Sequence, residues 1–305
     1  MIDVLRAGRC DLVMDLGRPG LGALGVPAGG AADPAALAAA NRLVGNEADA
    51  AGLEIILAGP MLRFPAGGVV ALAGAPFEAS RSSGGAVAWN QALLLGAGET
   101  LTLGRAQSGC RCWLAVRGEL AVPPVMGSRS TFLPAGFGGL GGRALQAGDS
   151  LPGVDGLGAV KWLRASPPEA CPAADQPLRV VAGPQAGLFD DVGLAAFFGS
   201  VYRVAAASDR RGLRLSGARV PHRRLELPSQ GVLPGAIQVP PDGQPIILGW
   251  DGPVTGGYPV IAAVIAADWP QLAQLQPGAV VRFETIEVEA AQALAAATWA
   301  IEEME

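Results

Sequence analysis

Short apolar runs, each ended by a glycine turn, recur along most of this chain. LEIILAG, MLRFPAG, VVALAGA, ALLLGAG and ETLTLG follow one another between Leu53 and Gly104, at intervals of roughly ten residues. The 44 glycines and 25 prolines are spread over the whole sequence, as turns between strands would be. This rhythm is typical of short antiparallel strands and predicts a mainly β protein.

The same rhythm returns in the second half, and a few segments depart from it. PLRVVAGP, YRVAAASD, GLRLSG, AIQVPP, PIILGW and VVRFETI predict further strands, and the alternation over 2–13 predicts a first strand at the N-terminus. A helix is predicted after Asp33, an N-cap followed by Pro34 at the first helical position, with Gly45 as its end. GLFDDVGLAAFFGS predicts a short helix. Residues 288–304 predict a terminal amphipathic helix, with one face formed by Ala291, Leu294, Ala295, Thr298 and Ile301.

The break in this rhythm divides the chain into two halves. Between Pro152 and Pro177 the strand pattern stops and the sequence becomes rich in proline. We therefore predict a first β-barrel half over 1–155, a linker over 156–177, and a second half with a C-terminal helix over 178–305.

Composition excludes several classes of function. The net charge is −5, so no basic surface is available to neutralise nucleic-acid phosphates. Lys161 is the only lysine and does not stand between two methionines, so no covalently attached biotin is expected on this chain. Four cysteines without a CxxC pair and a single histidine, His222, argue against a metal site. No leader pattern or bilayer-length apolar run is seen, which predicts a cytoplasmic protein without membrane segments.

Polar side chains gather between Gly235 and Asp268, next to glycines and prolines that fix the backbone. So many rigid corners indicate a pocket that holds polar groups at set distances, although a β-hairpin that merely needs turns is the alternative. The candidate binding residues here are Gln238, Asp242, Gln244, Thr255 and Tyr258, with Asp251 as a candidate catalytic acid or base.

Two glycine loops in the first half repeat this pattern. In MDLGRPG, Asp15 and Arg18 can meet as an ion pair or face a ligand together, and a purely structural pairing is the alternative. Ser128, Arg129, Ser130 and Thr131 precede GFGGLGG, a combination that can bind phosphate or carboxylate or can simply form a tight barrel corner.

Further candidates are an amide in a helix and a second acid–guanidinium group. Asn41 lowers helix propensity, so we expect it to form a specific hydrogen bond, and we include it among the candidate substrate-binding residues. Asp209 and Arg210 are also candidates, with the adjacent Arg211 expected at the surface. Because no nucleophile stands with His222, the residues suit transfer of an already activated group, with Asp15 or Asp251 relaying a proton.

Several long motifs identify a family resemblance. GAIQVPPDGQPIIL with TGGYP, the stretch from Met14 to Pro60, GSRSTFLPAGFGGLGGRALQAGD, GPQ and SDRRGLRLSG occur in this order. Together they resemble the carboxyltransferase-like family that includes the C subunit of 5-oxoprolinase, the KipI antagonist KipA and the carboxyltransferase part of urea carboxylase. Met14 and Arg211 depart from the family, which usually has Gln and Met there. The resemblance implies two cyclophilin-like β-barrels that can exchange strands.

The resemblance also implies a function. It favours a component of an ATP-dependent 5-oxoprolinase similar to the C subunit, which uses ATP through a complex with a KipI-like B subunit and an A-subunit-like protein. The alternatives are a biotin-dependent carboxyltransferase acting on urea or another amide, and a KipA-like regulatory module that binds a KipI-like kinase inhibitor. In every case, we predict that the 238–258 loop, Asp15, Arg18 and the 128–131 turn form one functional surface.

Overall fold

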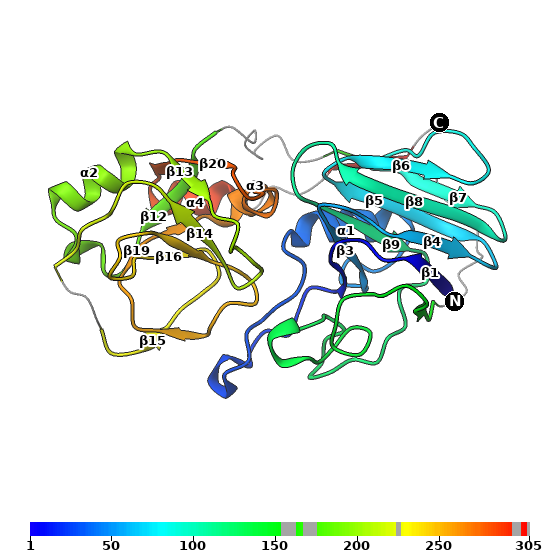
Figure 1. The fold of residues 1–305 in the computed structure, drawn as a ribbon, viewed down its shortest axis with the longest axis horizontal. Helices are drawn as coiled ribbons and strands as arrows, with labels where there is room; N and C mark the ends of the chain where they lie inside the picture. The colour runs from blue at the N-terminus through cyan, green and yellow to red at the C-terminus, as the bar shows by residue number, and fades with distance from the viewer. Residues whose placement is uncertain (154–162, 167–175, 224–226, 295–299, 304–305) are drawn as a thin grey trace. The chain divides into compact units, whose positions relative to one another are not determined.

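The chain folds mostly into short strands, which confirms the predicted mainly β architecture (Figure 1). The computed structural model describes residues 1–153, 163–166, 176–223, 227–294 and 300–303. Two compact units are present: the first comprises Met1–Arg18, Gly29–Pro168 and Thr298–Glu305, and the second comprises Pro19–Ala28 and Glu169–Ala297. Most of the predicted linker over 156–177 lies outside the described residues.

The first unit contains two five-stranded antiparallel sheets whose apolar faces share one core. The core contains Val4, Leu62 and Leu101 from one sheet and Leu53 and Leu114 from the other. The first sheet has the order β10 (Ser150–Leu151), β1 (Ile2–Arg6), β4 (Met61–Phe64), β8 (Glu99–Ala106), β6 (Phe77–Arg81). The second has the order β2 (Asp11–Met14), β3 (Gly52–Ile56), β9 (Arg111–Val116), β5 (Gly68–Gly74), β7 (Ala92–Leu95).

Helix α1 (Pro34–Leu43) packs against β9 and β5 of the second sheet. The Asp33 carboxylate accepts a hydrogen bond from the Ala36 N–H, and Gly45 has a φ of 80°, so both predicted helix ends are confirmed. Because the core lies on one side of β9 and α1 on the other, all six residues of β9 are buried. Gly52 permits this close packing, since a Cβ there would come within 2.9 Å of the Leu37 side chain.

The predicted first strand over 2–13 is wrong in one respect, because it is two strands. The chain turns between β1 and β2, and the Gly8 N–H donates to the Asp11 carboxylate at 2.5 Å. β1 pairs with β4 in one sheet, whereas β2 pairs with β3 in the other. The alternation of apolar residues continues through the turn and therefore does not reveal it.

The second unit is an eight-stranded sheet that nearly closes into a barrel. The strands at the two ends of the sheet, β20 (Val280–Val281) and β21 (Phe283–Thr285), are separated in sequence by Arg282 alone. The core includes Phe197 stacked on Phe283, with ring centroids 4.5 Å apart. Between β20 and β21 the order is β13 (Tyr202–Val204), β14 (Gly212–Ser216), β17 (Ile246–Leu248), β16 (Ala236–Gln238), β19 (Val260–Val264), β12 (Leu178–Ala182).

Smaller elements complete the second unit. Helix α2 (Asp191–Gly199) confirms the short helix predicted from sequence, and α3 (Trp269–Ala273) follows β19. A two-stranded sheet pairs β15 (Gln230–Gly231) with β18 (Thr255–Gly256). Among the described residues, 3₁₀ turns lie at Gly22–Leu24, Ala186–Leu188 and Ala266–Asp268 in the second unit and at Leu133–Ala135 in the first.

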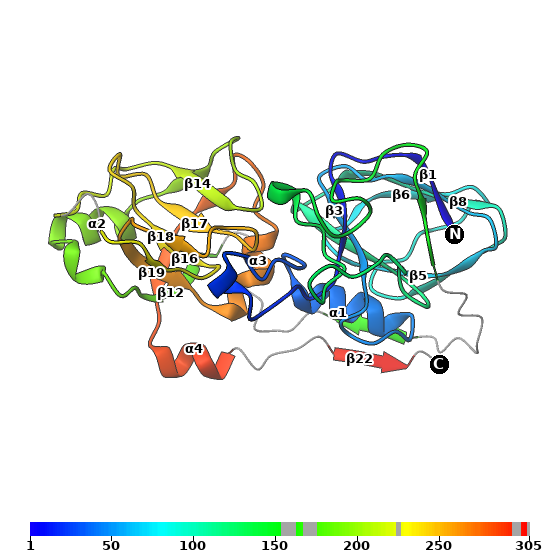
Figure 2. The same cartoon turned by 90° about the horizontal axis from the view of Figure 1, so that it is seen from below.

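The predicted terminal helix over 288–304 is wrong at residues 300–303. Helix α4 is described over Val288–Leu294, whereas residues 300–303 form strand β22 (Ala300–Glu303), which pairs antiparallel with β11 (Leu163–Ser166) (Figure 2). Ala295 and Thr298 of the predicted helix face lie outside the described residues. Strand β11 provides backbone partners for residues 300–303. This long-range pairing cannot be seen in a local sequence pattern, and it favours a strand over a helix at these residues. None of the helices in the described part of the chain has the length and apolar character needed to cross a bilayer.

Candidate functional site

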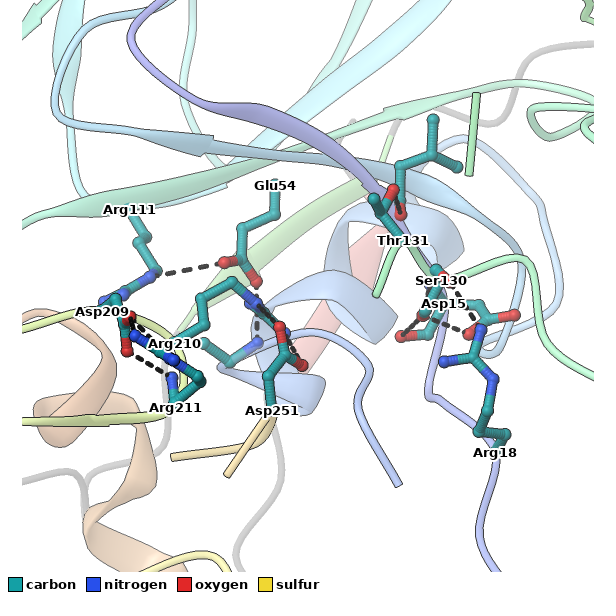
Figure 3. Close-up of polar contacts among 12 residues, drawn as sticks. Asp15, Arg18, Glu54, Arg111, Ser130, Thr131, Asp209, Arg210, Arg211 and Asp251 are labelled. Atoms are coloured by element: carbon teal, nitrogen blue, oxygen red, sulfur yellow. Dashed lines mark hydrogen bonds and ion pairs between the residues drawn. The ribbon is translucent and has the colours of Figure 1, made fainter. Parts of the chain in front are cut away.

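Asp15, at the end of β2, is the centre of a buried hydrogen-bond cluster in the first unit (Figure 3). Its Oδ1 accepts from Ser128 Oγ at 2.6 Å, Ser130 Oγ at 2.5 Å and the Gly17 N–H at 2.8 Å. Its Oδ2 accepts from the Arg129 N–H at 2.5 Å. The carboxylate therefore connects the 128–131 turn to β2, and the two serine hydroxyls donate to the protein's own acid.

Arg18 and Thr131 extend this cluster. Arg18 Nη2 donates to the Ser130 carbonyl at 2.5 Å, and its guanidinium carbon lies 5.0 Å from the centroid of the Phe137 ring. Thr131 Oγ1 and its N–H both donate to the Val13 carbonyl. Both side chains are buried and fix the loop against the sheet. This arrangement favours a scaffold for the turn over direct anion binding by its hydroxyls.

Arg129 is the accessible cation of the turn. Its side chain is about one-third exposed, and Nη2 lies 3.2 Å from Glu119 Oε1. Nε donates to the Val122 carbonyl at 3.0 Å. Of the residues in the 128–131 turn, Arg129 is thus the one whose charge reaches solvent and can meet an anionic group.

Asn41 forms the specific hydrogen bond that its unusual position predicts. The side chain is fully buried, and Nδ2 donates to the Ala50 carbonyl at 2.7 Å while Oδ1 accepts from Asn46 Nδ2 at 3.3 Å. These contacts close the loop after α1. They favour a structural role for Asn41 over contact with a substrate.

Asp251 and Arg210 form a buried two-point ion pair in the second unit. Arg210 Nε lies 2.8 Å from Asp251 Oδ2 and Nη2 lies 3.2 Å from Oδ1, and Asp251 is 3% exposed. The Asp251 N–H also donates to the Arg210 carbonyl. Because both carboxylate oxygens contact the guanidinium, Asp251 is better placed to orient Arg210 than to relay a proton.

Asp209 pairs with Arg211 at the surface. Arg211 Nε donates to Asp209 Oδ2 at 2.8 Å. The Arg211 side chain is 64% exposed, which confirms its predicted place at the surface. Partial burial raises the pKa of Asp209, but hydrogen bonds from the Arg211 side chain and N–H outweigh it, so the pKa is lowered overall. The adjacent residues 209–211 thus contribute to one exposed and one buried pair.

The 238–258 loop holds the remaining predicted residues in contrasting environments. Gln238 is 5% exposed, whereas Tyr258 is 40% exposed and Thr255 lies exposed on β18. Asp242 accepts a hydrogen bond from the Gln244 N–H, and the Gln244 carboxamide pairs with both backbone groups of Gly217. Both halves of the loop therefore combine buried and accessible polar groups.

The structure thus forms two local clusters, one around Asp15 in the first unit and one around Arg210 and Asp251 in the second. That the 238–258 loop, which contains Asp251, forms one surface with Asp15, Arg18 and the 128–131 turn stays a prediction. Among the residues described, no group of three or more histidine, cysteine, aspartate or glutamate side chains is placed to hold a metal ion.

Other buried or partly buried polar residues were not predicted from the sequence. Glu54, in the apolar strand β3, is fully buried, accepts from the Ala32 N–H at 2.8 Å and lies 3.4 Å from Arg111 Nε. A glutamate within an apolar strand is a signal that could have found it. Gln185 and Gln230 are hydrogen-bonded to each other at 3.1 Å. Gln185 belongs to the GPQ motif, but nothing in the sequence around Gln230 marks it.

Comparison with known proteins agrees with the motifs. The family described as "Carboxyltransferase domain, subdomain A and B" matches residues 24–285. The chain belongs to this carboxyltransferase family. It is 41% identical to the C subunit of 5-oxoprolinase from Escherichia coli over 301 residues, covering 95% of this chain and 93% of that protein. The corresponding protein of Haemophilus influenzae is 34% identical, with 96% and 94% covered.

A solved structure of the carboxyltransferase family has the same fold. The urea carboxylase of Kluyveromyces lactis superposes with a TM-score of 0.85 at 30% identity and covers 95% of this chain. The matched region is 28% of that larger protein. The fold is therefore that of a carboxyltransferase domain within urea carboxylase, and the remainder of that enzyme has no counterpart in the comparison.

Proposed function

We propose that this chain is the C-type component of an ATP-dependent 5-oxoprolinase, which converts 5-oxoproline, ATP and water to L-glutamate, ADP and phosphate. The observation that carries the proposal is the 41% identity to a 5-oxoprolinase C subunit, with nearly all of both chains aligned. Identity to the urea carboxylase structure is lower, and only 28% of that chain is aligned.

The chemistry of the described residues fits a protein that positions a substrate for others to activate. The lactam amide is stable, and ATP would supply the activation that makes it open to water. Asp15 accepts hydrogen bonds from the buried Ser128 and Ser130 hydroxyls, and Asp251 is paired with Arg210, so both acids are engaged by internal donors. Positioning and charge stabilisation by fixed polar groups are what such a site contributes.

The proposal implies partner proteins. We infer a KipI-like B subunit and an A-subunit-like protein, with ATP bound in the complex and no biotin attached to this chain. We place the complex in the cytoplasm, where ATP is available. The chain on its own is expected to be inactive.

Reconstitution tests this proposal. Purified complexes with and without this chain are incubated with 5-oxoproline and ATP, and glutamate is quantified. We expect glutamate only when the chain, its partners and ATP are all present. Opening of 5-oxoproline by the chain alone, or by the partners without it, would contradict the proposal.

A biotin-dependent carboxyltransferase is the second candidate, favoured by the fold shared with urea carboxylase. In that case the chain would catalyse transfer of a carboxyl group from carboxybiotin on a separate carrier to urea or another amide. The chain, supplied with urea, bicarbonate, such a carrier and a biotin carboxylase that recharges it, would then support urea-dependent ATP consumption. No observation on this chain favours the regulatory alternative, which would predict capture of a KipI-like protein without turnover.

A further inference from the structure

Three glutamines from separate segments of the second unit converge on the stretch from Gly256 to Val260. Gln185 follows β12, Gln230 lies in β15 and Gln238 ends β16; we call these three the amide cluster. Gln185 Nε2 donates to Gln230 Oε1 at 3.1 Å, and Gln185 Oε1 accepts from the Val260 N–H at 3.1 Å. In the sheet Gln238 is the register partner of Val260.

Gly256 lies between strand β15 with Gln230 and the side chain of Gln238. Gln230 is the register partner of Gly256 across the β15–β18 pair. A Cβ built on Gly256 would come 2.5 Å from Gln238 Nε2, so the carboxamide lies directly against the glycine backbone. Any larger residue at 256 would displace that amide. The glycine of the TGGYP motif therefore makes room for Gln238.

Two amide donors in this cluster have no hydrogen-bond partner among the described residues. Gln238 Nε2 and Gln230 Nε2 are both fully buried as atoms, and only 5% of Gln238 is exposed. A buried donor without an acceptor destabilises the folded protein, and native proteins keep few of them. One of these donors lies against Gly256 and the other belongs to the register partner of Gly256, which indicates a site at which an acceptor on a ligand completes the bonding.

The type of donor indicates the type of ligand. Carboxamides carry no charge, so the cluster suits a neutral acceptor better than a phosphate. In a five-membered lactam or cyclic urea, the ring holds N–H and C=O on the same side. A primary carboxamide presents N–H and C=O in the same way, and the two can form parallel hydrogen bonds. A ligand carbonyl oxygen has a second lone pair for another donor.

We propose that the amide cluster binds the N–H and C=O edge of a five-membered cyclic amide or urea. Gln238 contacts this edge directly, Gln230 Nε2 donates to its carbonyl oxygen, and Gln185 is a positioning residue that orients Gln230. The inference rests on the proposed function, because 5-oxoproline is such a lactam. A biotin ring presented by a separate carrier has the same edge, so the test distinguishes these two sources.

The test measures binding to the full-length chain without partners, by ligand-observed NMR. The probes are 2-pyrrolidinone for the lactam, imidazolidin-2-one for the cyclic urea and N-methyl-2-pyrrolidinone as the blocked control. We expect weak binding of the first two and at least tenfold weaker binding of the third, which lacks the N–H. Preference for 2-pyrrolidinone indicates a lactam substrate, and preference for imidazolidin-2-one indicates a ureido ring.

Variants locate the binding. Gln238→Glu and Gln230→Glu replace a donor with a carboxylate of the same shape and should each weaken probe binding at least tenfold. Gln276→Glu makes the same change at an exposed residue and should leave binding unchanged. Because Gln230 is only partly buried, its variant should fold even if the Gln238 variant does not. Gln185→Glu should weaken binding less, and the preference for 2-pyrrolidinone over its N-methyl form should remain, because Gln238 still contacts the ligand N–H.

Several results would overturn the inference. These are absence of lactam and cyclic urea binding to the wild-type chain, equal binding of the N-methyl control, or full binding by a folded Gln230→Glu variant. Failure of the reconstituted complex to form glutamate is a separate result. If the complex forms no glutamate while the chain still binds the lactam and the variants still weaken that binding, the proposed function is contradicted. The amide cluster then remains a binding site.

Discussion

Asp251 and Arg210 contact each other through two hydrogen bonds, of 2.8 and 3.2 Å, with both side chains almost fully buried. Removing one charge of this pair leaves the other in a poorly solvated place.

We therefore expect Asp251→Asn to lower the free energy of unfolding by about 3–5 kcal/mol. The double variant Arg210→Met with Asp251→Leu removes both charges and should lose less stability than Asp251→Asn. Urea unfolding of the variants measures this, with Arg211→Met, at an exposed pair, as a control expected within about 0.5 kcal/mol of wild type. A single variant as stable as wild type would contradict the structural role of the pair.

Asp15→Asn should loosen the turn over 128–131. The change places an amide N–H₂ among the four donors that contact the carboxylate, and we expect a loss of about 2–3 kcal/mol. Hydrogen exchange should be faster at the Arg129 amide, which donates to Asp15. Asp242→Asn is the matched control, because Asp242 is exposed and accepts from the Gln244 N–H. Unchanged exchange at Arg129 in the Asp15 variant would argue against the cluster.

Asn41→Ala should destabilise the protein without weakening substrate binding. Its buried contacts to Ala50 and Asn46 hold the loop after α1, so we expect a loss of about 1–3 kcal/mol. KM for 5-oxoproline in the reconstituted complex should stay within about twofold at a temperature where the variant is folded. A raised KM with unchanged stability would instead restore Asn41 as a substrate contact.

Asp11 predicts a pH dependence of stability. Burial raises its pKa to about 6, from 3.8, despite the hydrogen bond from the Gly8 N–H. The folded protein therefore binds the proton more tightly than the unfolded chain. This contribution is fully present below about pH 4 and is lost as the pH rises through 6, by up to about 3 kcal/mol.

Asp11→Asn does not titrate and isolates this effect. The stability of wild type relative to Asp11→Asn should be higher at pH 4 than at pH 7, as measured by urea unfolding at both values. A difference between the two proteins that does not change with pH would show that Asp11 does not titrate in this range.

Local signals predicted the elements that local interactions stabilise. Asp33, Pro34 and Gly45 specify both ends of α1, because capping depends on neighbours within a few residues. The β22 strand at Ala300–Glu303 was predicted as helix, because its partner β11 lies more than a hundred residues earlier and no local pattern records that pairing.

Local sequence signals likewise predicted only part of the candidate site. Glycine and proline turns marked where polar residues are held, but not which of them pair. Asp15 meets Ser130 across 115 residues, and Arg210 meets Asp251 across 41. The adjacent Arg211 was as plausible a partner for Asp251 by sequence. Gln230 lacks any marking motif, and its place opposite Gly256 follows only from the strand register.

The most direct measurement of the central claim is glutamate formed per ATP hydrolysed by the reconstituted complex, with and without avidin. Avidin binds biotin and would block any step that needs a biotinylated carrier. We predict one glutamate for each 5-oxoproline-dependent ATP hydrolysed, with no effect of avidin. Loss of ATP turnover in avidin, or 5-oxoproline-independent turnover without glutamate, would contradict this claim.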